Sequence, residues 1–94
     1  MNPPVICDHP DDVVGVRPLP GYVLEVRFGD GLQGTVDLDR LIHAPDAGVF
    51  SALIDPDRFA AAYVEFGAVT WPGEIDLAPD AMYEEIKAHG RWVL

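Results

Sequence analysis

The sequence predicts an α+β fold: an antiparallel β-meander with short helices and a C-terminal helix packed on one face of the sheet. Two observations carry this prediction. Apolar and polar residues alternate between residues 22 and 38, as in strands with one buried face. Beyond residue 38 the apolar spacing lengthens to three and four residues, which is typical of helices. The 94 residues suit a single domain, which we place at residues 13–94 after a flexible N-terminal arm at residues 1–12.

Three extended runs form the predicted meander, joined by turns rich in proline and glycine. In the first run, Val14 and Val16 share one face. The second run is the clearest, because strict alternation puts four apolar residues on one side: Tyr22, Leu24, Val26 and Phe28. The Asp-Gly pair that follows suits a tight hairpin turn. The third run has as its apolar residues Leu32, Val36 and Leu38.

Short helical segments follow the meander. Asp37 is placed to cap the first of them. The second is predicted from four apolar residues at helical spacing: Val49, Phe50, Leu53 and Ile54. Pro56 ends this segment and suits the first position of a further turn that bears Phe59.

Two more strands are expected before the last helix. Their alternating apolar residues are Ala62, Val64 and Phe66 in the first strand, and Val69 and Trp71 in the second. A turn at Gly67 joins the two strands. Pro72-Gly73 ends the second strand, because proline donates no hydrogen bond to a ladder.

The last helix is predicted to begin at Pro79, where the missing N–H of proline costs no helical hydrogen bond. Leu77 and Met82 stand at the positions that fix the entry angle of a helix, and the buried stripe continues through Tyr83 and Ile86.

The predicted strands and helices share one core. Truncating Leu24 or Val26 in this core to alanine is expected to lower the free energy of unfolding by about 2–4 kcal/mol. We expect the core to consist of Tyr22, Leu24, Val26, Phe28, Val36, Leu38, Leu53, Phe59, Val64, Trp71, Leu77, Met82 and Ile86.

Acidity is the chief feature of the composition. Sixteen Asp and Glu residues face six Lys and Arg residues, so the formal net charge is −10. This charge disfavours direct binding of nucleic acid or of an anionic membrane, and it favours a basic protein partner. Acidity also serves solubility alone. The single cysteine, Cys7, and the absence of a signal-peptide pattern or a long apolar run lead us to expect a cytoplasmic protein.

Candidate metal ligands and catalytic groups are scattered along the sequence. The mixed cluster of Cys7, Asp8, His9, Asp11 and Asp12 lies in the proline-containing arm and lacks the four fixed ligands of a structural zinc site. His43 and His89 are candidate general bases, because histidine as a residue type can exchange a proton near neutral pH. Each is expected near the C-terminal end of a helix, where the helix dipole favours a cation, so a capping or surface role is the alternative.

The remaining candidates are carboxylates and one hydroxyl. Asp37, Asp39 and Asp76 could form a catalytic pair, but Asp37 and Asp76 also precede helices, where aspartate bonds to backbone N–H groups. Ser51 has no neighbouring base. We therefore expect no catalysis, no metal site and no cofactor.

The C-terminal tail is apolar. After Gly90, which suits the end of a helix, the chain continues through Arg91 to Trp92, Val93 and Leu94. Two alternatives stay open for these last three residues. The tail folds back on its own sheet, or it contacts a second copy or a protein partner as an added strand, with Trp92 as the anchor.

Four motifs in this order resemble a small bacterial family, domain of unknown function 2442. They are L-x-V-x-F-x-D-G from Leu24, G-x-V-D-L from Gly34, F-x-x-L-x-D-P-x-x-F from Phe50, and a closing signature from Trp71-Pro72 through Asp76-Leu77 and Pro79 to Tyr83. The loop Gly73-Glu74-Ile75 and Met82 depart from the usual Asn-Gly and leucine. The resemblance implies a fold without an established activity. It also implies a neighbouring gene for another small protein, domain of unknown function 4160, and an antitoxin-like role.

We therefore interpret the protein as a small cytosolic protein-interaction module. The resemblance adds an antitoxin-like role in a two-gene pair, with a basic protein encoded by the neighbouring gene as partner, and a homodimer also stays open. A small ligand-binding domain or an enzyme is the alternative interpretation. Identifying the product of the neighbouring gene would separate these hypotheses.

Overall fold

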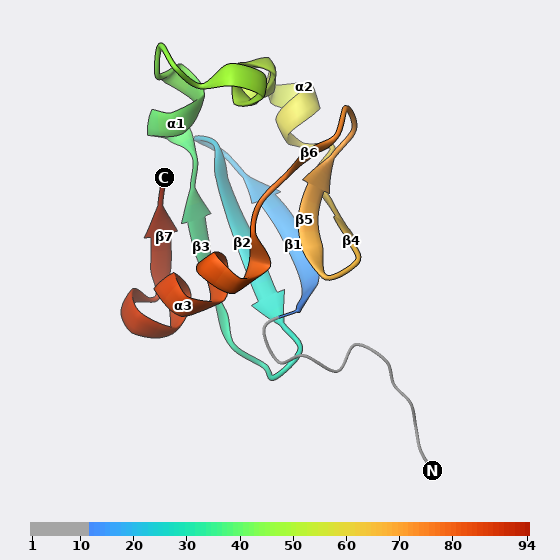
Figure 1. Ribbon diagram of the computed structural model, residues 1–94, viewed down its shortest axis with the longest axis vertical. Helices are drawn as coiled ribbons and strands as arrows, with labels where there is room; N and C mark the ends of the chain where they lie inside the picture. The colour runs from blue at the N-terminus through green and yellow to red at the C-terminus, as the bar shows by residue number, and fades with distance from the viewer. Residues whose placement is uncertain (1–11) are drawn as a thin grey trace.

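The computed structural model describes residues 12–94 and shows an α+β fold, as the sequence predicts. Within these residues, two β-sheets, three short helical segments and a C-terminal helix surround one core (Figure 1). The expected N-terminal arm lies outside the described residues apart from Asp12, whose carbonyl accepts a hydrogen bond from the Gly29 N–H at 2.9 Å. No helix within residues 12–94 is long and apolar enough to cross a membrane.

The larger sheet has four strands in the order β1-β2-β3-β7. β1 (Val13–Leu19), β2 (Val23–Phe28) and β3 (Gln33–Asp37) form the predicted antiparallel meander. Leu24, Val26 and Phe28 are each at most 1% exposed, so the predicted face of β2 is confirmed. The register of β1 shifts between Val13 and Gly15. This irregularity buries Val13, and Val14, which was expected to share a face with half-buried Val16, is instead 46% exposed.

The C-terminal helix, α3 (Pro79–His89), covers the inner face of this sheet and leads into β7 (Arg91–Val93), which runs parallel to β3 (Figure 1). As predicted, the helix begins at Pro79 and is stopped by Gly90, which follows its last residue with a φ of 80°. Gly34 allows the helix to approach β3 closely. A Cβ at Gly34 would lie 2.5 Å from Cγ2 of Ile86 and 2.7 Å from the carbonyl oxygen of Gly90.

The smaller sheet has three antiparallel strands, β4 (Tyr63–Glu65), β5 (Ala68–Trp71) and β6 (Ile75–Asp76). It adjoins β1, where the Gly67 carbonyl accepts the Val13 N–H at 2.8 Å. Its inner face buries Val69, Trp71 and Ile75. The prediction that Phe66 continues the alternation of β4 is wrong, because the strand ends at Glu65 and Phe66 lies in the following turn.

The sheets are connected by α1 (Asp39–His43), the 3₁₀ helix η1 (Gly48–Ile54) and α2 (Pro56–Phe59). Asp37 has the expected capping contact, since its Oδ1 accepts the Asp39 N–H at 3.0 Å, although Leu38 holds the cap position itself. At α2, Oδ1 of Asp55 accepts the Asp57 N–H at 2.9 Å.

The apolar stripe predicted for η1 is only partly correct. Leu53 is buried and Phe50 is half-buried, but Val49 and Ile54 are 61% and 49% exposed. In a 3₁₀ helix, residues three apart lie on the same side. Phe50 and Leu53 therefore face the core together. Val49 and Ile54, which the α-helical spacing placed on the same side, face away from the core.

The core agrees closely with the sequence prediction. All predicted core residues are buried except Tyr22 and Val64, which are partly buried and pack against the core. Trp71, the largest fully buried residue, donates its Nε1–H to the Phe59 carbonyl at 2.9 Å, so its polar atom is satisfied. Ile75 is buried as well, as expected from its place before Leu77, and the core also contains three residues that the predicted list omitted: Val13, Ile42 and Val69.

Candidate interaction surface

The outer face of the three-stranded sheet is open to solvent. Strand pairing places Thr70 between Tyr63 and Asp76, and it places Glu65 opposite Ala68. Paired residues share a face, so these side chains point away from buried Val69 and Trp71. None of the outward-facing residues is buried.

The turn between β4 and β5 consists of Phe66 and Gly67, with φ values of 52° and 76°. Two positive φ values between paired Glu65 and Ala68 are the pattern of a type I′ turn, which favours Asn-Gly. A phenylalanine in the left-handed region is strained, because its side chain crowds the backbone there. The same position leaves Phe66 95% exposed. Phe66 therefore stabilises neither the turn nor the core.

A second strained residue borders this face. Glu74, in the turn between β5 and β6, has a φ of 65°. Within residues 12–94, Tyr22 is the other non-glycine residue with a positive φ. Phe66 and Glu74 line one hollow of about 400 Å³ together with Glu65, Ala68, Thr70, Asp76 and Pro79. We call these seven lining residues the Phe66 surface.

The Phe66 surface carries carboxylates and no cation. Glu65, Glu74 and Asp76 form no ion pair within the described residues. The hydroxyl of Tyr63 donates to Oε1 of Glu65 at 3.1 Å, and this hydrogen bond raises the pKa of Tyr63, because the deprotonated hydroxyl could not donate it. The Lys and Arg residues all lie on other elements: Arg17, Arg27, Arg40, Arg58, Lys87 and Arg91.

The tail lies along its own sheet. β7 pairs with β3, and the Leu94 N–H donates to the Asp37 carbonyl at 3.0 Å. Trp92 and Leu94 are half-buried against the core, whereas Val93 is 41% exposed. The first of the two alternatives for the tail is thus the one observed in the single chain. A partner contact by Trp92, Val93 and Leu94 stays a prediction.

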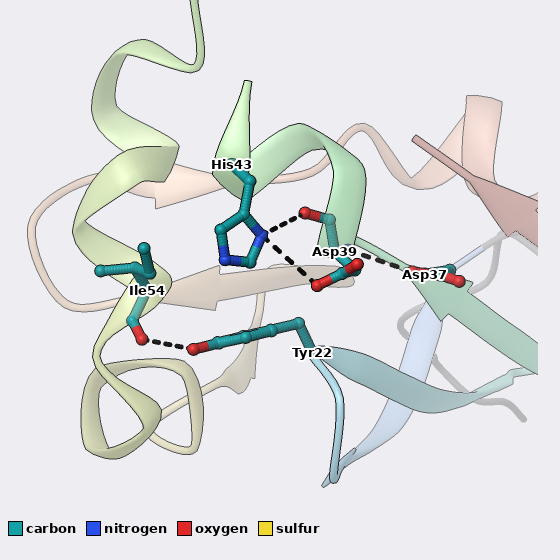
Figure 2. A network of polar contacts seen from close by, with 5 residues as sticks. All are labelled: Tyr22, Asp37, Asp39, His43 and Ile54. Carbon is teal, nitrogen blue, oxygen red and sulfur yellow. Dashed lines mark hydrogen bonds and ion pairs between the residues drawn. The ribbon is translucent and has the colours of Figure 1, made fainter. Parts of the chain in front are cut away.

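Asp37, Asp39 and His43 lie together where β3 meets α1 (Figure 2). Nδ1 of His43 is 2.8 Å from the Asp39 carbonyl and 3.3 Å from Oδ1 of Asp39. Tyr22 packs edge-on against His43, with ring centroids 5.6 Å apart, and its hydroxyl donates to the Ile54 carbonyl at 2.5 Å. These contacts tie α1 and η1 to the start of β2, so the group has a structural role, and His43 ends α1 as expected.

The other candidates do not assemble into a site. Asp76 lies in the smaller sheet and Asp37 in the larger one, so the two carboxylates do not form a pair. His89 ends α3, and Oγ of Ser51 donates to the Gly48 carbonyl at 2.8 Å. No group of three metal-ligating side chains occurs within residues 12–94. The remaining ligand candidates lie outside that range: Cys7, Asp8, His9 and Asp11.

Residues 13–88 match the protein family described as protein of unknown function (DUF2442). The match spans most of the chain and confirms the resemblance seen in the motifs. The chain belongs to this family. No curated protein and no solved structure matches it. The match ends before β7 begins at Arg91.

The motifs that carry the DUF2442 resemblance serve the fold in this chain. The first motif supplies the buried residues of β2 and then Asp30. Oδ2 of Asp30 accepts the Tyr83 hydroxyl at 2.5 Å, and Oδ1 accepts the Leu32 N–H at 2.9 Å. Both hydrogen bonds stabilise the ionised carboxylate and so lower the pKa of Asp30, and the bond from Tyr83 has the larger effect. Phe66 lies outside the four motifs, so they do not explain its exposure.

Sequence reasoning missed Phe66 because the residue continues the alternation of Ala62 and Val64. The signal that could have identified Phe66 as a turn residue is the short distance in sequence between the two neighbouring strands. Only Phe66 and Gly67 separate Glu65 from Ala68, which is the length of a two-residue hairpin turn with Gly in its second position.

Proposed function

We propose that this DUF2442 protein is a protein-interaction module that binds a partner through the Phe66 surface. The observation that carries the proposal is Phe66, which is 95% exposed at a φ of 52°. Burying a phenylalanine side chain stabilises a structure by about 1.5–3 kcal/mol, and the single chain gains none of this. Exposed aromatic residues that become buried in a complex are frequent binding hot spots. Phe66 therefore suits an anchor in a partner's pocket.

In this proposal the protein acts by binding and not by catalysis. The carboxylates considered for catalysis have other contacts or none: Asp37 bonds to the Asp39 N–H, and Asp76 lies on the Phe66 surface. The single cysteine favours a reducing compartment, so we place the proposed activity in the cytoplasm. The partner is the protein encoded by the neighbouring gene, and this chain is the antitoxin-like member of the pair.

The test is to co-express the chain with the product of its neighbouring gene and to measure the dissociation constant of the purified complex. Phe66→Asn should weaken binding about 30-fold or more, because truncating a hot-spot residue costs about 2 kcal/mol or more. The matched control is Val49→Asn, which removes an apolar side chain that is 61% exposed on η1. Equal binding by wild type and Phe66→Asn would show that Phe66 is not the anchor.

A small ligand-binding domain is the second candidate function, and one hollow favours it. This hollow of about 290 Å³ lies between α2 and β5 and is lined by Leu53, Trp71 and Ile75, with Arg58 as its charged residue. An apolar wall beside one cation suits a small apolar carboxylate. A rise in melting temperature with phenylacetate that Arg58→Gln abolishes would favour this alternative.

A further inference from the structure

We infer that the Phe66 surface binds a protein segment that carries lysine or arginine side chains. The inference rests on the proposed function and adds the chemistry of the partner. Exposed carboxylates alone are ordinary solvated surface. Here they line the same hollow as an exposed phenylalanine on an open sheet face, so the surface offers both an apolar anchor and a charge for the partner to match.

The charges of the Phe66 surface have no counterpart within the described chain. Glu65, Glu74 and Asp76 line the same hollow, and none of them forms an ion pair with residues 12–94. Their local charge adds to the formal net charge of −10. Complementary charge across an interface speeds association and excludes wrong partners. A basic segment is therefore the complement, and a second copy of this chain would bring a further −10 to the contact.

The carboxylates suit long cationic side chains and not a metal ion. A calcium or magnesium ion needs several oxygen ligands that converge within about 2.0–2.6 Å of one point, and no group of three candidate ligands occurs in the described residues. Lysine and arginine can instead reach carboxylates that lie apart. Their methylene stems can cover the Phe66 ring, and their charged ends attract its π face.

The test uses a defined probe, a short acetylated and amidated peptide of alternating arginine and leucine. A matched peptide carries citrulline, the uncharged analogue, in place of arginine. Binding is followed through the backbone amide signals of the ¹⁵N-labelled chain. We expect saturable shifts at Phe66, Ala68 and Thr70 with the arginine peptide, and binding about tenfold weaker with the citrulline peptide.

Two triple variants separate local from overall charge. The surface variant is Glu65→Gln, Glu74→Gln, Asp76→Asn, and the control variant is Asp46→Asn, Glu84→Gln, Glu85→Gln. All six residues are exposed, and each variant changes the formal charge from −10 to −7 by removing three carboxylates. The surface variant should bind the arginine peptide about tenfold more weakly, whereas the control variant should change binding by less than about threefold.

Three results would overturn the inference: equal weakening by both variants, equal binding of both peptides, or shifts that fall away from the Phe66 surface. The spectrum of each variant reports whether it is folded. The natural partner then separates this inference from the proposed function. If Phe66→Asn abolishes partner binding and the surface variant leaves it unchanged, the interaction module stands and the cationic chemistry is wrong.

Discussion

The two sheets each bury one face and expose the other, but their exposed faces differ in how the charges are matched. On the larger sheet, Arg17 lies opposite Glu25, and their side chains form an ion pair at 2.8 Å. Arg27 lies over Gly15, where a Cβ would be 3.4 Å from its guanidinium. On the smaller sheet the carboxylates have no ion pair within the described chain, and Phe66 is exposed beside them.

This contrast shows that the fold alone does not determine what an outer face carries. The inner faces of both sheets are stabilised in the same way, by the burial of apolar side chains. On the outer face of the larger sheet, the ion pair between Arg17 and Glu25 neutralises part of the charge. The outer face of the smaller sheet has two non-glycine residues with a positive φ, an exposed phenylalanine and carboxylates without an ion pair within residues 12–94, which is why we propose that a partner binds on that side.

The largest expected effect comes from breaking the inner face of the larger sheet. Gly34→Ala should destabilise the protein by about 3 kcal/mol, because the new methyl group would overlap Ile86 and the fixed carbonyl of Gly90. The matched control is Gly15→Ala on the outer face of the same sheet, where we expect a change within about 0.5 kcal/mol. Urea denaturation of both variants measures the difference. Similar values for the two variants would mean that α3 can shift away from β3.

The inner faces are the part of the fold that the sequence predicts well. Leu24, Val26 and Phe28 were assigned to the core from alternation alone, because a half-buried strand has a period of two. The alternation breaks down where local geometry departs from a regular element. The bulge at Val14 and the turn at Phe66 are such places.

Tertiary pairing explains the rest of what was missed. β6 has only two residues, so it carries too little alternation to be recognised as a strand. The sequence left two alternatives open for the tail, because β7 depends on β3, a partner more than fifty residues earlier in the chain, to which it lies parallel. The candidate surface was missed for the same reason, since Glu65, Glu74 and Asp76 line one hollow only after β4, β5 and β6 have paired.

A smaller effect of opposite sign is expected on the smaller sheet. Phe66→Asn should stabilise the isolated chain by about 1 kcal/mol, because asparagine tolerates the left-handed region and suits the first position of a type I′ turn. Val49→Asn also removes an exposed apolar residue, at 61% against 95% for Phe66, but at a position without a positive φ, and it should stay within about 0.5 kcal/mol of wild type. Thermal denaturation of the two variants and of wild type measures the difference in stability. Destabilisation by Phe66→Asn would mean that the ring supports the fold and would weaken the case for an anchor.

The smallest effect is expected at the ion pair on the outer face of the larger sheet. Arg17 and Glu25 pair at 2.8 Å, but their side chains are 69% and 45% exposed, so water and salt screen the attraction. A double-mutant cycle with Arg17→Ala and Glu25→Ala should give a coupling energy of about 0.2–1 kcal/mol that falls as salt is added. A coupling above about 2 kcal/mol would make the Arg17–Glu25 pair a structural element.

Glu65, by contrast, has no ion pair to lose within the described chain, so Glu65→Gln should leave the free energy of unfolding unchanged or raise it by relieving repulsion from the carboxylates that line the same hollow. Urea denaturation of Glu65→Gln and of wild type measures this difference. A marked loss of stability in Glu65→Gln would show instead that the charges of the smaller sheet support the fold and are not kept for a partner.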